Sequence, residues 1–177
     1  VTGNTRRYGQ SLQKITKVVP PRPGEIMFGL NMIVNKGKTV FIGDTSVHEY
    51  PSSKELAEIA ISSARVVRLF GFTPKVAFLS HSTFGQPMTS RTKHIRDAVE
   101  ILRQKQVDFK FDGDMQPDVA LNEEYRELYP MSEIVGNANV LIMPGQHSAA
   151  ISYKIMKEMS SSKVIGPLLI GLGAAIE

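Results

Sequence analysis

Short apolar runs and amphipathic helical patterns alternate along most of this chain. The runs "KVAFLS" at 75–80 and "ANVLIMP" at 138–144 have the length and composition of strands that are covered on both faces. A last apolar run, "KVIGPLLIGL", occupies 163–172. Strands that alternate with helices form a mostly parallel sheet with helices on its faces, so we predict a three-layer α/β fold.

Local signals place the individual elements. We predict a β-hairpin whose two strands are 25–35 and 38–44. Ser52 and Glu55 have the spacing of a capping box, which predicts a helix that begins there and ends at Gly71. The remaining patterns predict helices over 90–106, 121–130 and 147–159, and a short strand over 108–111.

The Pro-rich segment "VVPPRPGE" at 18–25 is the one plausible linker. It divides an N-terminal arm and linker, 1–23, from an α/β unit, 24–177. A chain of 177 residues with 42% hydrophobic content can bury one full core. Because it starts without Met and ends directly after an apolar run, we expect a piece of a longer protein.

The composition limits the compartment and the partners. The absence of cysteine excludes disulfides and thiolate chemistry and favours the cytoplasm. No stretch approaches the ~20 apolar residues of a membrane span, so we expect no membrane partner. The net charge of +4 favours an anionic ligand. Scattered basic residues and few aromatic ones favour a phosphorylated small molecule over nucleic acid.

The loop after 75–80 and the helix that follows it have features of an anion site. Arg91 and Lys93 lie in the first helical turn, where the helix dipole disfavours positive charge by about 0.3–1 kcal/mol per residue. A bound anion would reverse that penalty. Ser82, Thr83 and Ser90 add hydroxyl groups at the edge of the sheet where ligands of α/β folds bind. A solvated helix end is the equally weighted alternative.

Other kinds of site find little support. The chain lacks the G-x-S-x-G motif of serine hydrolases, and its histidines lack metal-ligand spacing. Asp112, Asp114 and Asp118 resemble part of a calcium loop without its later Glu, and we interpret them as turn-forming or capping residues. We therefore predict no catalytic residue and no metal ligand in this chain.

Five stretches between about residues 24 and 173 resemble the phosphate acetyltransferase family. They are "GKTVFIGDTSVHEYPSSKELAEIAISSARVVRLFG", "PKVAFLSHSTFG", "DFKFDGDMQPDVALN", "NANVLIMPGQHSAAISYK" and "VIGPLLIGL". The resemblance is closest to the version fused behind the catalytic part of large bacterial NADP-dependent malic enzymes. It implies a fold related to isocitrate and isopropylmalate dehydrogenases, of which this chain covers mainly the second subdomain. It also implies a homodimer or higher homo-oligomer and a coenzyme A (CoA) ligand.

Two departures from the family pattern bear on activity. The family's transferases, which make acetyl-CoA and phosphate from acetyl phosphate and CoA, carry Tyr-Lys-x-x-x-Arg, whereas Tyr153 and Lys154 are followed here by Glu158. An acid beside an anionic substrate is costly. The chain also leaves the pattern after Gly173. The resemblance thus implies a non-catalytic domain that senses acetyl-CoA as an inhibitor, in a parent malic enzyme that uses NADP and a divalent metal ion.

The anion features and the resemblance together predict the contacts of acetyl-CoA. Adjacent guanidinium groups in the arm suit a 3′-phosphate or a pyrophosphate, although an exposed arm without fixed contacts is the alternative. For Lys154 the alternative is an ordinary surface lysine. Two other functions stay open, an active phosphate acetyltransferase and a purely structural dimerisation module. The predicted contacts are Arg6, Arg7, Ser82, Thr83, Ser90, Arg91, Lys93, Ser148 and Lys154.

Overall fold

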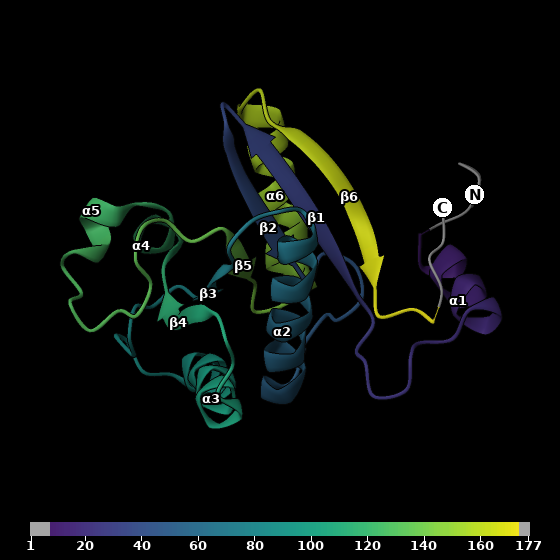
Figure 1. Cartoon of the computed structure of the whole chain (residues 1–177), viewed down its shortest axis with the longest axis horizontal. Coiled ribbons are helices and arrows are strands. Elements are labelled where there is room, and N and C mark those ends of the chain that lie inside the picture. The colour runs from purple at the N-terminus through teal and green to yellow at the C-terminus, as the bar shows by residue number, and fades with distance from the viewer. Residues whose placement is uncertain (1–7, 174–177) are drawn as a thin grey trace.

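Six strands and six helices make up the part of the chain, residues 8–173, that the computed structural model describes (Figure 1). Within the N-terminal arm, the described residues form a helix. In chain order the elements are α1 (Tyr8–Val18), β1 (Phe28–Asn35), β2 (Lys38–Gly43), α2 (Ser53–Leu69), β3 (Lys75–Leu79), α3 (Ser90–Lys105), β4 (Lys110–Met115), α4 (Pro117–Leu121), α5 (Glu123–Arg126), β5 (Val140–Ile142), α6 (Gln146–Met159) and β6 (Lys163–Ile170).

The strands form one mixed sheet in the order β4-β3-β5-β2-β1-β6. The first four in this order are parallel to one another, whereas β1 is antiparallel to both β2 and β6. The predicted hairpin is confirmed, and Lys36 and Gly37 at its turn both have positive φ, as a two-residue turn of this kind requires. The predicted α/β class is also confirmed.

Each central strand contributes to two apolar cores, because successive side chains point to opposite faces of the sheet. Phe41 and Val76 belong to the core beneath α2 and α3. Their chain neighbours Ile42 and Ala77 belong to the core on the other face, which α4 and α6 cover. Figure 1 shows α2 in front of the sheet and α6 behind it, so the domain has three layers.

Helix α2 illustrates how the local signals produce the fold. The Ser52 side chain accepts a hydrogen bond from the Glu55 backbone N–H, and the Glu55 carboxylate accepts one from the Ser52 backbone N–H, which completes the predicted capping box. The apolar face that includes Leu56 is fully buried against the sheet. The helix ends just before Gly71, as predicted.

Two expectations for the middle of the chain are wrong. The single helix expected over 121–130 is two short helices, α4 and α5, because Pro117 starts a helix earlier. Strand β4 continues past residue 111 and carries Asp112 and Asp114, which are therefore buried strand residues rather than turn residues. Backbone N–H groups satisfy the Asp112 carboxylate, which is why a buried strand tolerates it.

The corner after β2 is held by a buried carboxylate. Asp44 is 1% exposed and accepts hydrogen bonds from the backbone N–H groups of Gly29, Ser46, Val47 and His48. The His48 ring Nδ1 lies 2.7 Å from its Oδ2. Asp44 thus fixes the start of the segment 44–52, which leads into α2.

No helix within residues 8–173 is both long enough and apolar enough to cross a membrane.

We expect Leu56→Ala to lower the free energy of unfolding by about 2–5 kcal/mol, because it leaves a cavity in the core beneath α2. Leu128→Ala is the matched control, since Leu128 is 75% exposed and its loss should change stability by less than about 0.5 kcal/mol. Urea denaturation followed by circular dichroism compares the two. Equal losses in both variants would contradict the assignment of the core.

The Asp44–His48 pair predicts that stability falls as the pH rises. The hydrogen bond to Asp44 raises the pKa of His48 above its ordinary 6.5, although burial opposes this. Burial by itself raises the pKa of Asp44, but hydrogen bonds from His48 and from backbone N–H groups outweigh it and hold that pKa below 3.8. The contribution of protonated His48 is therefore complete below about pH 6.5 and is lost as the pH rises through its folded pKa.

We therefore expect the difference in unfolding free energy between wild type and His48→Asn to shrink between pH 6 and pH 8.5. Urea denaturation at each pH measures it. The exposed Leu128→Ala variant, which removes no ionisable group, is the control and should show no such trend. A difference that stays constant or grows over this range would count against the pair.

Candidate functional site

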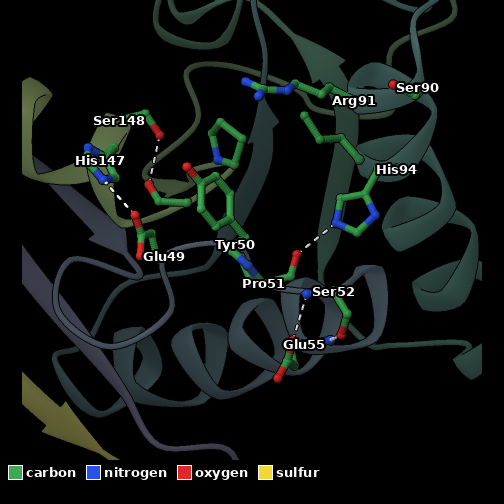
Figure 2. Close-up of a pocket in the computed structure, with 13 residues that line it drawn as sticks. Glu49, Tyr50, Pro51, Ser52, Glu55, Ser90, Arg91, His94, His147 and Ser148 are labelled. Atoms are coloured by element: carbon green, nitrogen blue, oxygen red, sulfur yellow. Dashed lines mark hydrogen bonds and ion pairs between the residues drawn. The ribbon is translucent and has the colours of Figure 1, made fainter.

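A cavity of about 540 Å³ lies where β2 and β5 end and where α2, α3 and α6 begin (Figure 2). It is at the carboxyl edge of the parallel strands, where ligands of α/β folds bind. The parallel pairing of β2 with β5 brings the segment 44–52 against the start of α6. The lining residues are Glu49, Tyr50, Pro51, Ser52, Glu55, Ser90, Arg91, His94, Ile95, Pro144, Gly145, His147 and Ser148.

Three of the predicted contact residues line this cavity together, namely Ser90, Arg91 and Ser148. Arg91 is exposed, and Figure 2 shows its side chain reaching over the cavity from α3. It forms no ion pair with any residue of the described range 8–173. Ser148 donates a hydrogen bond to the Gly145 carbonyl oxygen at 2.8 Å, within the first turn of α6.

Ser82 and Thr83 lie elsewhere, as buried residues of the loop after β3. The Ser82 hydroxyl donates to the Asp114 carboxylate, which also accepts from the Gly85 backbone N–H. The Thr83 hydroxyl oxygen accepts from the Gln116 backbone N–H at 3.2 Å. In this structure the two hydroxyls therefore hold the loop to the end of β4.

The remaining predicted contacts also lie apart from the cavity. Lys93 is 3.0 Å from the Asp97 carboxylate and lines a different pocket on α3. Lys154 is exposed on α6, and its Nζ lies 5.9 Å from the centre of the Tyr153 ring. Arg6 and Arg7 lie outside the described residues.

Histidines that the sequence analysis did not select hold the walls together. His94 Nε2 lies 2.7 Å from the Pro51 carbonyl oxygen and its Nδ1 lies 2.9 Å from Ser53 Oγ, so His94 joins the starts of α2 and α3. His147 Nε2 lies 3.0 Å from Glu49 Oε1 and joins α6 to the segment 44–52.

The rule that ligands bind at the carboxyl ends of parallel strands could have identified the segment 44–52 from the sequence. The sequence, however, shows β2 only as one arm of a hairpin. Its parallel pairing with β5 becomes visible only in the structure.

Arg91 and the helix starts are features of the cavity that suit an anion, and the carboxylates of Glu49 and Glu55 line the same space. Three helices begin there, and helix N-termini carry partial positive charge. Helix α6 has no side-chain cap at Gly145. The Glu55 carboxylate is part of the capping box. It accepts a hydrogen bond from the Ser52 backbone N–H, and this bond lowers the pKa of Glu55. Glu49 lies 3.0 Å from His147, and among the lining residues Arg91 carries the guanidinium group.

The described part of the chain contains no group of three or more His, Cys, Asp or Glu side chains arranged to hold a metal ion.

Comparison with known proteins agrees with the fold and with the resemblance seen in the sequence. The family model "Phosphate acetyl/butaryl transferase" matches residues 1–177. The chain is 45% identical over 177 residues to the NADP-dependent malic enzyme of Rhizobium meliloti (strain 1021), covering 100% of this chain and 23% of that protein. It is 35% identical over 179 residues to the NADP-dependent malic enzyme of Escherichia coli (strain K12), covering 99% and 24%.

Among solved structures, a phosphotransacetylase from Streptococcus pyogenes superposes with a TM-score of 0.89 at 28% identity, covering 97% of this chain and 53% of that one. The chain thus spans about a quarter of the malic enzymes that it matches and about half of the phosphotransacetylase. A match over the full chain, together with this superposition, confirms the resemblance. The chain belongs to the phosphate acetyl/butaryl transferase family.

Proposed function

We propose that this chain is the acetyl-CoA-binding regulatory domain of an NADP-dependent malic enzyme and that it does not itself catalyse acetyl transfer. The support is its similarity, over nearly its whole length, to parts of two proteins of that name. In this proposal the parent protein is a cytoplasmic homo-oligomer. Its catalytic part binds NADP and a divalent metal ion and decarboxylates malate to pyruvate.

The observation that carries the proposal is the cavity at the carboxyl edge of the sheet. Its volume of about 540 Å³ lies within the range of small-molecule sites. It combines Arg91, which has no ion-pair partner within residues 8–173, with the starts of three helices. Phosphate groups suit both features, because guanidinium groups and helix N-termini each donate hydrogen bonds to phosphate oxygens.

The proposed lack of acetyl transfer rests on a residue of α6. By the resemblance, Glu158 stands where the family's transferases have an Arg, so a negative charge replaces a positive one. It is exposed near the end of α6 and does not line the cavity. The cavity hydroxyls of Ser52 and Ser148 are engaged in hydrogen bonds of the helix starts. Arg91 can hold a phosphate group, so the cavity suits an anionic ligand. The proposal that the chain does not transfer acetyl groups rests instead on its departures from the transferase pattern.

Regulation requires that acetyl-CoA bind one state of the oligomer better than another, because equal affinity for both states shifts nothing. The helices that line the cavity also cover the two faces of the sheet. A ligand that changes how α3 and α6 start can therefore change the outer surfaces that contact the malic enzyme part.

We expect Arg91→Gln to weaken acetyl-CoA binding about tenfold or more, the effect of losing one hydrogen bond between charged groups. Arg96→Gln is the matched control, since Arg96 lies on the same helix but lines another pocket. It should change the affinity less than twofold. Isothermal titration calorimetry on the full-length protein measures both, and Lys154→Gln in the same series tests the predicted contact on α6.

The same protein distinguishes the rival functions. Inhibition of malate decarboxylation by acetyl-CoA, weaker in Arg91→Gln than in Arg96→Gln, supports the proposal. Sustained formation of acetyl-CoA from acetyl phosphate and CoA would instead indicate an active phosphate acetyltransferase, the activity named for the similar Streptococcus structure. Absence of acetyl-CoA binding, with loss of the oligomer when residues 24–177 are deleted, would indicate a structural dimerisation module.

A further inference from the structure

Tyr50 is an exposed aromatic residue inside the cavity. Its side chain is 77% exposed, yet it lines the same space as Arg91 and Ser148. Figure 2 shows its ring between His147 and Ser148 on one side and Arg91 and His94 on the other. We propose that Tyr50 is the stacking platform for the adenine base of the bound CoA ester, an inference that rests on the proposed function.

The backbone on both sides of Tyr50 is fixed. Asp44 holds the beginning of the segment 44–52, and the capping box at Ser52 holds its end. Glu49, the preceding residue, is paired with His147. The backbone that carries the ring is therefore fixed. A ligand that stacks on the ring restricts only the side-chain rotations of Tyr50, which costs little conformational entropy.

Gly145 lets this segment approach α6 closely. A Cβ atom at residue 145 would lie 2.3 Å from the Glu49 carbonyl oxygen, which no side chain allows. The close approach brings the residue after Glu49 next to the start of α6, where it lines the cavity. The position of Tyr50 thus follows from the contacts of its neighbours.

Tyr50 itself contributes little to the described fold. Most of its ring is in contact with solvent, and its hydroxyl has no hydrogen-bond partner within residues 8–173. A large aromatic side chain held in this way offers a ring face to a planar ligand. Every nucleobase has such a face, and Arg91 across the cavity can pair with the phosphates attached to it.

A ligand that contacts both Tyr50 and Arg91 must carry a planar base joined to phosphate. In a CoA ester this part is the 3′-phosphoadenosine end. Two other contacts compete for the ring. The acyl-pantetheine arm of the ligand could pack on it, or another part of the full-length protein could cover it. The experiment separates these three.

The test compares three probes, acetyl-CoA, adenosine 3′,5′-bisphosphate and acetyl-pantetheine, by calorimetric titration of the full-length protein. Tyr50→Leu should weaken the two adenine-containing probes about fivefold or more, the lower end for loss of one base stack. Tyr50→Phe keeps the ring and should stay within twofold of wild type. Acetyl-pantetheine should bind the wild type and Tyr50→Leu alike.

Tyr125→Leu is the control, since Tyr125 is half exposed on α5, away from the cavity. If Tyr50→Leu weakens acetyl-pantetheine as much as adenosine 3′,5′-bisphosphate, the ring contacts the acyl arm and the inference is wrong. If Tyr50→Leu binds every probe as the wild type does, the ring is covered by another part of the protein or makes no contact with the ligand. The inference is then wrong as well, while the proposed function stands. If acetyl-CoA does not bind the wild type, both fail.

Discussion

The candidate site depends on one buried carboxylate at the end of β2. An ionised side chain that is 1% exposed is stable only when its oxygens are hydrogen-bonded, and four backbone N–H groups and the His48 ring supply those bonds to Asp44. One of the N–H groups belongs to Gly29 on β1, so the carboxylate ties the hairpin to the segment 44–52. Without it, the segment 44–52, which carries Glu49 and Tyr50, would lose its anchor at the end of β2.

A second buried acid anchors a loop at the edge strand β4. Asp114, at the end of β4, accepts from the Ser82 hydroxyl and the Gly85 backbone N–H, and so holds the loop that leads into α3. In both places a glycine precedes the acid at the end of a strand. Two loops anchored in this way bring Tyr50 and Arg91 to one cavity already formed, which reduces the entropy that a ligand must overcome.

Membership of the family does not by itself decide between transfer and sensing. The chain is similar both to a structure named a phosphotransacetylase and to proteins named malic enzymes. Fold alone does not fix function, and the decision lies with individual side chains. In this chain Arg91 lines the cavity near the start of α6, whereas Glu158 lies at the other end of that helix.

The sequence alone determined the elements with local signals, such as the hairpin, the capping box of α2 and the apolar strands, and it selected Ser90, Arg91 and Ser148. It could not show which strands are parallel neighbours, so the segment after β2 and its residues Glu49 and Tyr50 escaped notice. Pairing and burial are properties of distant parts of the chain. Only the tertiary structure could therefore separate Ser82, Thr83, Lys93 and Lys154 from the cavity and turn Asp112 and Asp114 into buried strand residues.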